Sequence, residues 1–308
     1  MEQTETEIMK NEIMKNEIMK NESKPESISE IRPESKENAA VEFADGIKII
    51  RNIPYTEERE TRNCYDLYLP AEEGTDTEAP QTLVIYFYGG SLKKGCKDKQ
   101  AFPGALIREL RERGAAHGSV AVACPDYRLI PDVMYPTFIN DAAEAVRAAT
   151  ERYSTEYGSP KRIFIAGYSA GAYISMMLCF DKKYLAVQGI DADKITGYLL
   201  MSGQPTKHMS VLECDGMDKR AIVVDQTSAL YHIGPHGAPL LIATSDMDLK
   251  NRREQNMLLC TALKTFGYDS KVDFVNLGDI PHGAMAKKDE NGKVPLVDCA
   301  ADFIDGIS

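Results

Sequence analysis

The stretch RIFIAGYSAGAYISMML, residues 162–178, decides the fold of this chain. A short apolar run at 162–166 predicts a strand buried on both faces, and the apolar run at 170–180 predicts a buried helix. Between them, Ser169 lies in a Gly-x-Ser-x-Gly pentapeptide whose glycines permit a tight turn. A serine held in a strained strand-to-helix turn is typical of a catalytic nucleophile; the alternative is a turn that serves packing alone.

The sequence on both sides of this stretch alternates between strand and helix patterns. Strands that alternate with helices predict a mostly parallel, doubly wound α/β sheet with helices on both faces. Besides 162–166 and 170–180, we predict strands at 64–70, 82–88, 119–129, 195–202, 238–245 and 271–277, and helices at 102–116, from Thr137 to about 153, 251–268 and 295–307.

The N-terminal segment differs in composition from the rest of the chain. Residues 7–22 repeat the unit EIMKN, and a five-residue step spreads the isoleucines around a helix, so no apolar stripe forms. We therefore expect residues 1–40 to be a disordered polar tail and residues 41–308 to form one folded domain. The polar segment 202–236, between two predicted strands, is expected to be a small cap-like insertion.

Charge and cysteine usage exclude several classes of function. The net charge of −11 argues against nucleic acid or an anionic membrane surface as a partner. Seven cysteines, an odd number without a Cys-x-x-Cys pair, indicate a reducing compartment and no structural zinc. Because no apolar run is long enough for a membrane span, we expect a cytoplasmic protein. We also expect that it uses neither a metal nor a cofactor. Oligomeric state is left open.

A serine nucleophile needs a base and an orienting acid. His282, in the loop after the last predicted strand, is the best-placed of the five histidines, because the chain order serine, acid, histidine is one of the known triad orders. The acid should follow a strand between these two residues, where Asp246 and Asp248 are the candidates. We favour Asp248, which the loop carries further over the sheet edge, and expect Asp246 to support the loop.

An oxyanion hole is the remaining requirement. Gly89 and Gly90 directly follow a predicted strand, so their backbone N–H groups can face a substrate carbonyl. Together with the N–H of Ala170, they are predicted to bind the developing oxyanion; the alternative is a glycine turn that merely ends the strand.

Taken together, the motifs YGGS (88–91), PDYRLIP (125–131), GYSAG (167–171), SDMD (245–248) and PHG (281–283) resemble those of the α/β-hydrolase family. Within it, they resemble carboxylesterases related to hormone-sensitive lipase and to small feruloyl or acetyl esterases. The resemblance covers roughly residues 41–308. It implies an α/β-hydrolase fold, a Ser169–His282–Asp248 triad, and a chiefly structural role for the Asp-Tyr-Arg stretch beginning at Asp126.

Two departures from the family pattern concern the pocket. The usual His-Gly-Gly-Gly reads Tyr88-Gly89-Gly90-Ser91, and Tyr168 precedes the nucleophile where the hormone-sensitive-lipase group commonly has Asp. We therefore name Tyr88, Ser91 and Tyr168 as substrate-binding candidates.

The sequence thus favours a serine hydrolase that cleaves small-molecule carboxylic esters through an acyl-enzyme. An amide or formamide hydrolase, or a peptidase, would use the same triad. In a different class, a hydrolase fold can serve as a non-catalytic binding protein.

Overall fold

The computed structural model describes residues 40–57, 62–70, 79–114, 120–268 and 271–307. Apart from Ala40, the predicted N-terminal tail lies outside these ranges. Ala39–Ser308 forms one compact unit, to which every element described below belongs.

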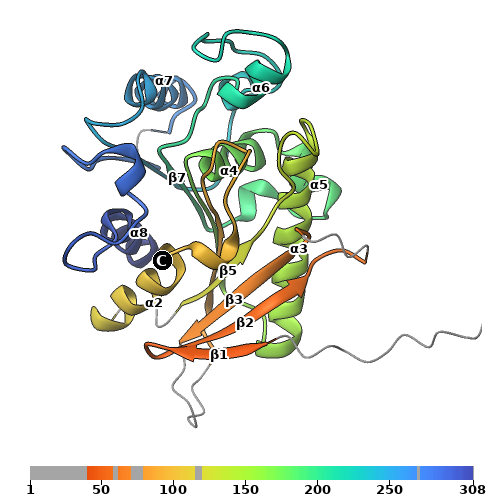
Figure 1. Ribbon diagram of the computed structural model, residues 1–308, viewed down its shortest axis with the longest axis vertical. Helices are drawn as coiled ribbons and strands as arrows, with labels where there is room; N and C mark the ends of the chain where they lie inside the picture. The colour runs from red at the N-terminus through yellow and green to blue at the C-terminus, as the bar shows by residue number, and fades with distance from the viewer. Residues whose placement is uncertain (1–39, 58–61, 71–78, 115–119, 269–270, 308) are drawn as a thin grey trace, which may run out of the picture. The chain divides into compact units, whose positions relative to one another are not determined.

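A single nine-stranded sheet runs through the described part of this unit (Figure 1). Its order is β1-β2-β3-β5-β4-β6-β7-β8-β9. The first three strands and β5 pair antiparallel, and from β5 to β9 all neighbours are parallel. The strands are β1 Val41–Ala44, β2 Ile47–Pro54, β3 Cys64–Pro70, β4 Thr82–Phe87, β5 Val120–Pro125, β6 Arg162–Tyr168, β7 Gly197–Met201, β8 Leu240–Thr244 and β9 Val272–Asn276.

Helices cover the sheet on both faces. In Figure 1, α2 and α8 pack against each other on one side of the sheet, and α3 lies on the other side, where it packs on α4. None of the helices in the described ranges is long and apolar enough to span a membrane. They are α2 Phe102–Glu112, α3 Thr137–Tyr157, α4 Ala170–Phe180, α5 Lys183–Val187, α6 Met209–Cys214, α7 Arg252–Lys264 and α8 Pro295–Gly306, with 3₁₀ turns η1 Lys97–Lys99, η2 Ala192–Lys194, η3 Ala229–His232 and η4 His282–Ala284.

The predicted fold class is confirmed. The central strand β4 is buried along its whole length, as its continuous apolar run predicts for a strand covered on both faces. Every residue of α4 is buried too, which agrees with its lack of a polar face.

The topology collects four polar side chains at one edge of the sheet. Because β6, β7, β8 and β9 are parallel neighbours, their carboxyl ends lie side by side. Ser169 directly follows β6, Ser202 follows β7, Asp248 lies in the loop after β8, and His282 lies in the loop after β9. Ligand sites of open α/β sheets form at this edge.

Candidate active site

Ser169 occupies a sharp turn between β6 and α4. Its φ of 55° lies in the left-handed region, which is unusual for a residue with a side chain. The turn fits only because Gly171 lacks a side chain: a Cβ there would lie 1.9 Å from the carbonyl oxygen of Phe87. The serine side chain is thereby held at the edge of the sheet, with 9% of the residue exposed.

The three residues predicted as a triad form one chain of hydrogen bonds. The Oγ of Ser169 lies 2.9 Å from Nε2 of His282. The Nδ1 of His282 lies 2.6 Å from Oδ1 of Asp248. An ionised carboxylate only accepts hydrogen bonds, so Nδ1 carries the proton, which leaves Nε2 as the acceptor for the serine hydroxyl.

Asp248 is held in its ionised form. Burial alone would raise the pKa of this carboxyl, but hydrogen bonds from His282 and Ser202 outweigh burial, so the pKa lies below its ordinary value. Its Oδ1 also accepts a hydrogen bond from the backbone N–H of Leu249 at 2.7 Å. The ionised carboxylate therefore lies against Nδ1 of His282. There it would stabilise the positive charge of the imidazole ring once Nε2 had taken a proton.

Asp246 lies apart from this chain of hydrogen bonds. Its Oδ1 accepts a hydrogen bond from the Asn276 amide at 2.9 Å, and it forms an ion pair with Arg253 at 3.4 Å. The backbone N–H of Asp246 donates to the carbonyl of Gly278. These contacts tie the loop after β8 to the loop after β9.

Ser202 is a site residue that the sequence analysis missed. Its Oγ donates to Oδ2 of Asp248 at 2.7 Å and lies 3.0 Å from Nδ1 of His282. The residue is fully buried, has a φ of 55°, and its carbonyl accepts a hydrogen bond from the Arg252 guanidinium at 2.6 Å. The only sequence signal was its place as the last residue of the predicted strand 195–202, the next predicted strand after that of Ser169.

We expect Ser202→Ala to lower kcat about 10- to 100-fold, because it removes a hydrogen bond to a buried charge worth about 1.5–3 kcal/mol. KM should change little, since Ser202 is covered by Asp248 and His282. Initial rates with p-nitrophenyl acetate would measure both parameters. Ser154→Ala removes a serine whose hydroxyl bonds only within α3, to the carbonyl of Thr150, and should leave both unchanged. Wild-type kcat in Ser202→Ala would show that Asp248 needs no second partner.

The predicted oxyanion residues lie around Ser169. A Cβ built on Gly89 would lie 2.9 Å from the Cβ of Ser169, which places this glycine directly beside the serine. The carbonyl of Gly90 accepts hydrogen bonds from the N–H groups of Lys93 and Lys94, both at 3.1 Å, and closes the loop. Gly90 has a φ of 138°, and a Cβ there would lie 1.9 Å from the Lys94 carbonyl oxygen, so the loop requires glycine.

The N–H groups of this loop are available for a ligand. Among the residues that the structure describes, those of Gly89, Gly90 and Ala170 donate to no protein acceptor. Ala170 is the first residue of α4, where helix N–H groups have no partner within the helix and favour negative charge.

Tyr88 does not have the position expected of a substrate-binding residue. Its side chain is fully buried, stacks on Tyr127 and donates a hydrogen bond to Oδ1 of Asp126 at 2.6 Å. The guanidinium of Arg62 contacts the same hydroxyl at 3.3 Å and donates to the carbonyl of Gly95 at 2.5 Å. Tyr88 thus stabilises the glycine loop, because its phenol hydroxyl points into the protein and contacts Asp126 and Arg62.

The other two pocket candidates lie closer to the site. The ring of Tyr168 stacks on that of His282, with centroids 5.2 Å apart, and its hydroxyl donates to the His282 carbonyl. Burial raises the pKa of Tyr168, so it stays a neutral donor. Ser91 is half-buried, has a φ of 57°, and its carbonyl accepts a hydrogen bond from Ser210 at 2.6 Å.

His208, in the predicted cap segment, is buried. Its Nδ1 accepts a hydrogen bond from the N–H of Ser210 and caps α6, and its ring packs on Tyr173, one helical turn beyond the nucleophile. Burial lowers the pKa of His208 to about 3. In the described ranges, no three His, Cys, Asp or Glu side chains gather in a group that could hold a metal ion.

This buried imidazole predicts a pH dependence of stability. Unfolding returns the pKa of His208 from about 3 to its ordinary value near 6.5, so the unfolded chain takes up a proton that the folded chain refuses. The free energy of unfolding should therefore fall as the pH drops below 6.5, by about 2 kcal/mol between pH 7 and pH 5 from this group. Urea unfolding at pH 7, 6 and 5 would measure it.

His208→Asn keeps a side chain that can cap α6 and should lose this part of the pH dependence. Ser210→Ala changes the same turn but retains the imidazole, so it should keep the wild-type slope. Equal slopes in His208→Asn and wild type would contradict the assignment.

Comparisons with known proteins bear on the fold and on the proteins that this chain resembles. The sequence profile described as the α/β-hydrolase fold matches residues 84–231. A probable isoprenylcysteine alpha-carbonyl methylesterase of Oryza sativa subsp. japonica is 32% identical over 128 residues, 42% of this chain and 28% of the relative. A carboxylesterase of Mycobacterium tuberculosis is 36% identical over 97 residues, 31% of this chain and 28% of the relative. The chain therefore matches less than a third of the length of either protein.

Solved structures extend the likeness to most of the chain. A truncated carbohydrate esterase from gut microbiota superposes with a TM-score of 0.63 at 16% identity, covering 88% of this chain and 96% of that one. Esterase 2 of Thermogutta terrifontis gives a TM-score of 0.62 at 17% identity, covering 84% and 94%. At such identities the superpositions establish the fold alone. Together with the sequence matches, they show an α/β-hydrolase fold in a chain that is similar to proteins named as carboxylesterases and esterases.

Proposed function

We propose that this protein is a serine carboxylesterase that hydrolyses small carboxylic esters through an acyl-enzyme intermediate. The observation that carries the proposal is the continuous Ser169–His282–Asp248 hydrogen-bond chain beside three unpaired backbone N–H groups. A nucleophile, a base with an orienting acid, and oxyanion donors are the parts that acyl transfer requires.

In the first half of the reaction, Nε2 of His282 takes the proton of the Ser169 hydroxyl as Oγ attacks the ester carbonyl carbon. The carbonyl oxygen becomes negative and accepts hydrogen bonds from the N–H groups of Gly89, Gly90 and Ala170. The ionised Asp248 stabilises the imidazolium. Collapse of the tetrahedral intermediate breaks the bond to the alkoxy oxygen, which leaves as an alcohol after His282 returns the proton.

In the second half, water attacks the acyl-enzyme carbonyl and gives its proton to His282. The same N–H groups bind the second oxyanion, and collapse frees the carboxylic acid and restores Ser169. Every proton is carried by His282, so no metal or cofactor is needed in this scheme.

We infer the substrate class from the names of the matched relatives. The matched relatives are named as a methylesterase and a carboxylesterase, and we extend from their names only the ester bond and a small alcohol leaving group. We expect substrates to be small molecules rather than polymers or nucleic acids, in keeping with the net charge of −11.

The test is hydrolysis of p-nitrophenyl acetate, butyrate and octanoate, with p-nitroacetanilide as the matching amide. We expect turnover of the shorter esters, and little of the anilide, with His282→Ala as the inactive reference. Efficient anilide cleavage would favour the amidase alternative. An inactive wild type that also fails to react with a fluorophosphonate would favour a non-catalytic hydrolase fold.

A further inference from the structure

A cationic pocket lies between α6 and the amino end of α7, two helices that neighbour each other in Figure 1. Its volume is about 360 Å³. Four cationic side chains and no acidic one line it, although the chain as a whole carries a net charge of −11. Among its lining residues are Met209, Lys219, Arg220, Leu249, Lys250 and Arg252.

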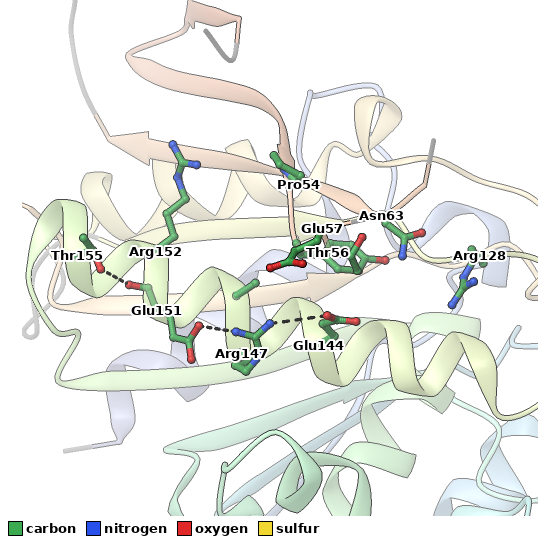
Figure 2. A pocket seen from close by; sticks show the side chains of 12 residues that line it. Pro54, Thr56, Glu57, Asn63, Arg128, Glu144, Arg147, Glu151, Arg152 and Thr155 are labelled. Carbon is green, nitrogen blue, oxygen red and sulfur yellow. Dashed lines mark hydrogen bonds and ion pairs between the residues drawn. The ribbon is translucent and has the colours of Figure 1, made fainter. Parts of the chain in front are cut away.

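A second pocket in the molecule gives a useful contrast. It has a volume of about 780 Å³ along α3 and is shown in Figure 2. There, Arg147 forms ion pairs with Glu144 at 3.7 Å and Glu151 at 2.5 Å, both also in the pocket wall. The wall of that pocket contains acidic as well as cationic side chains, whereas the wall of the cationic pocket contains cationic side chains and no acidic one.

Arg252 is the residue that most strongly indicates affinity for an anion. Only 4% of the residue is exposed, and buried arginines are rare unless paired with an acid. Its guanidinium donates to two neutral acceptors, the carbonyl of Ser202 at 2.6 Å and Oε1 of Gln204 at 3.5 Å. Within the described part of the chain, no carboxylate lies within ion-pair distance of it.

The charge of Arg252 persists at neutral pH. Burial lowers its pKa, but only to about 10, and Asp248 opposes this effect through space. The two oxygens of Asp248 are already engaged by Ser202 and His282. The pocket thus contains a buried cation that no carboxylate of the described residues pairs with directly.

The amino end of α7 contributes the positive end of a helix dipole, and Glu254 in its first turn lies outside the pocket wall. Arg252 begins this 13-residue helix, and the side chain of the preceding Asn251 forms no capping hydrogen bond. Lys250 is exposed and has no ion-pair partner among the described residues. Lys219 pairs with Glu213 at 3.8 Å, and Arg220 pairs with Asp218 at 2.5 Å. Both acids are exposed and lie outside the pocket wall. The helix dipole favours an anion at such an end.

We propose that this pocket binds a small organic anion. Its carboxylate or phosphate group contacts Arg252, Lys250 and the first turn of α7, and a short apolar part packs on Met209 and Leu249. This site does not depend on the proposed esterase activity, because no cationic side chain of the pocket forms a hydrogen bond with Ser169, His282 or Asp248 among the described residues. The anion is either a separate effector or the acidic end of an ester substrate.

Isothermal titration calorimetry of the full chain with succinate and with inorganic phosphate tests the site. We expect binding of at least one anion, weakened by raised salt, and none of the neutral analogue succinamide. Lys250→Gln should weaken binding about 5-fold, the effect of losing one exposed charge contact. Lys161→Gln removes an exposed lysine at the opposite, amino end of β6 and should bind like wild type.

Absence of binding of both anions to wild type, or equal binding by Lys250→Gln and Lys161→Gln, would overturn the proposal. Calorimetry needs no turnover, so these results are independent of the proposed function.

Kinetics then separates the two sources of the anion. If it is the acidic end of a substrate, Lys250→Gln raises KM about 5-fold for p-nitrophenyl hydrogen succinate but leaves KM for p-nitrophenyl butyrate unchanged. If it is an effector, succinate changes the rate with p-nitrophenyl butyrate in wild type and requires higher concentrations to do so in Lys250→Gln. Either pattern supports the site.

Discussion

Replacing Ser169 by alanine is expected to lower kcat for p-nitrophenyl acetate by about 10⁴- to 10⁶-fold. The hydroxyl is the only group that we assign to the covalent step, and its Oγ is 2.9 Å from the base. The oxyanion donors stay in place, so a residual rate above that of water should remain. Progress curves at high enzyme concentration, corrected for the spontaneous reaction, would measure it.

The fold of this variant should be retained, because alanine keeps the Cβ that the turn already accommodates at a φ of 55°. Circular dichroism and a thermal melt would verify this. Ser154→Ala serves as the matched serine substitution and should keep the wild-type rate. A Ser169→Ala protein that retains more than about 1% of wild-type kcat would mean that another residue is the nucleophile.

Asp248→Asn is expected to lower kcat by about 10⁴-fold. An asparagine of the same size can present its NH₂ group to Nδ1, which would move the ring proton to Nε2 and leave His282 unable to accept the serine proton. It would also remove the charge that stabilises the imidazolium. The measurement is kcat for the same acetate ester, with the variant's thermal stability determined in parallel.

Asp246→Asn is the matched control, two residues away in the same loop. Asp246 is exposed and contacts only Asn276, Arg253 and the Gly278 backbone among the described residues, so kcat should stay within about 3-fold of wild type. If Asp246→Asn were instead the inactive variant, the acid would be assigned to the wrong aspartate.

Most of the architecture could be predicted because its signals are local. The apolar run of β4 and the small-residue turn around Ser169 each lie within a few consecutive residues. Ser169, Asp248 and His282 each follow a predicted strand. Their order along the chain was therefore enough to predict that they meet at one sheet edge. We did not predict β1 and β2: all four residues of β1 are exposed, and the irregular burial of β2 and its bulge between Ile50 and Ile53 hide the strand alternation.

The rest depends on contacts between distant parts of the chain. Ser202 touches Asp248, 46 residues later, and nothing near Ser202 in the sequence distinguishes it from an ordinary loop serine. Tyr88 was misjudged for the same reason: its partner Asp126 is 38 residues away, and only the fold turns the phenol inward. Likewise, the buried Arg252 lies in a polar segment whose pattern predicts a solvent-exposed helix start.

Labelling with a fluorophosphonate, read by intact mass and peptide mapping, tests most directly whether Ser169 is a nucleophile activated by His282. The account predicts one adduct per chain on the peptide that contains Ser169, no adduct in Ser169→Ala, and labelling slowed by orders of magnitude in His282→Ala and Asp248→Asn. An adduct on a different residue, or unchanged labelling without His282, would contradict it.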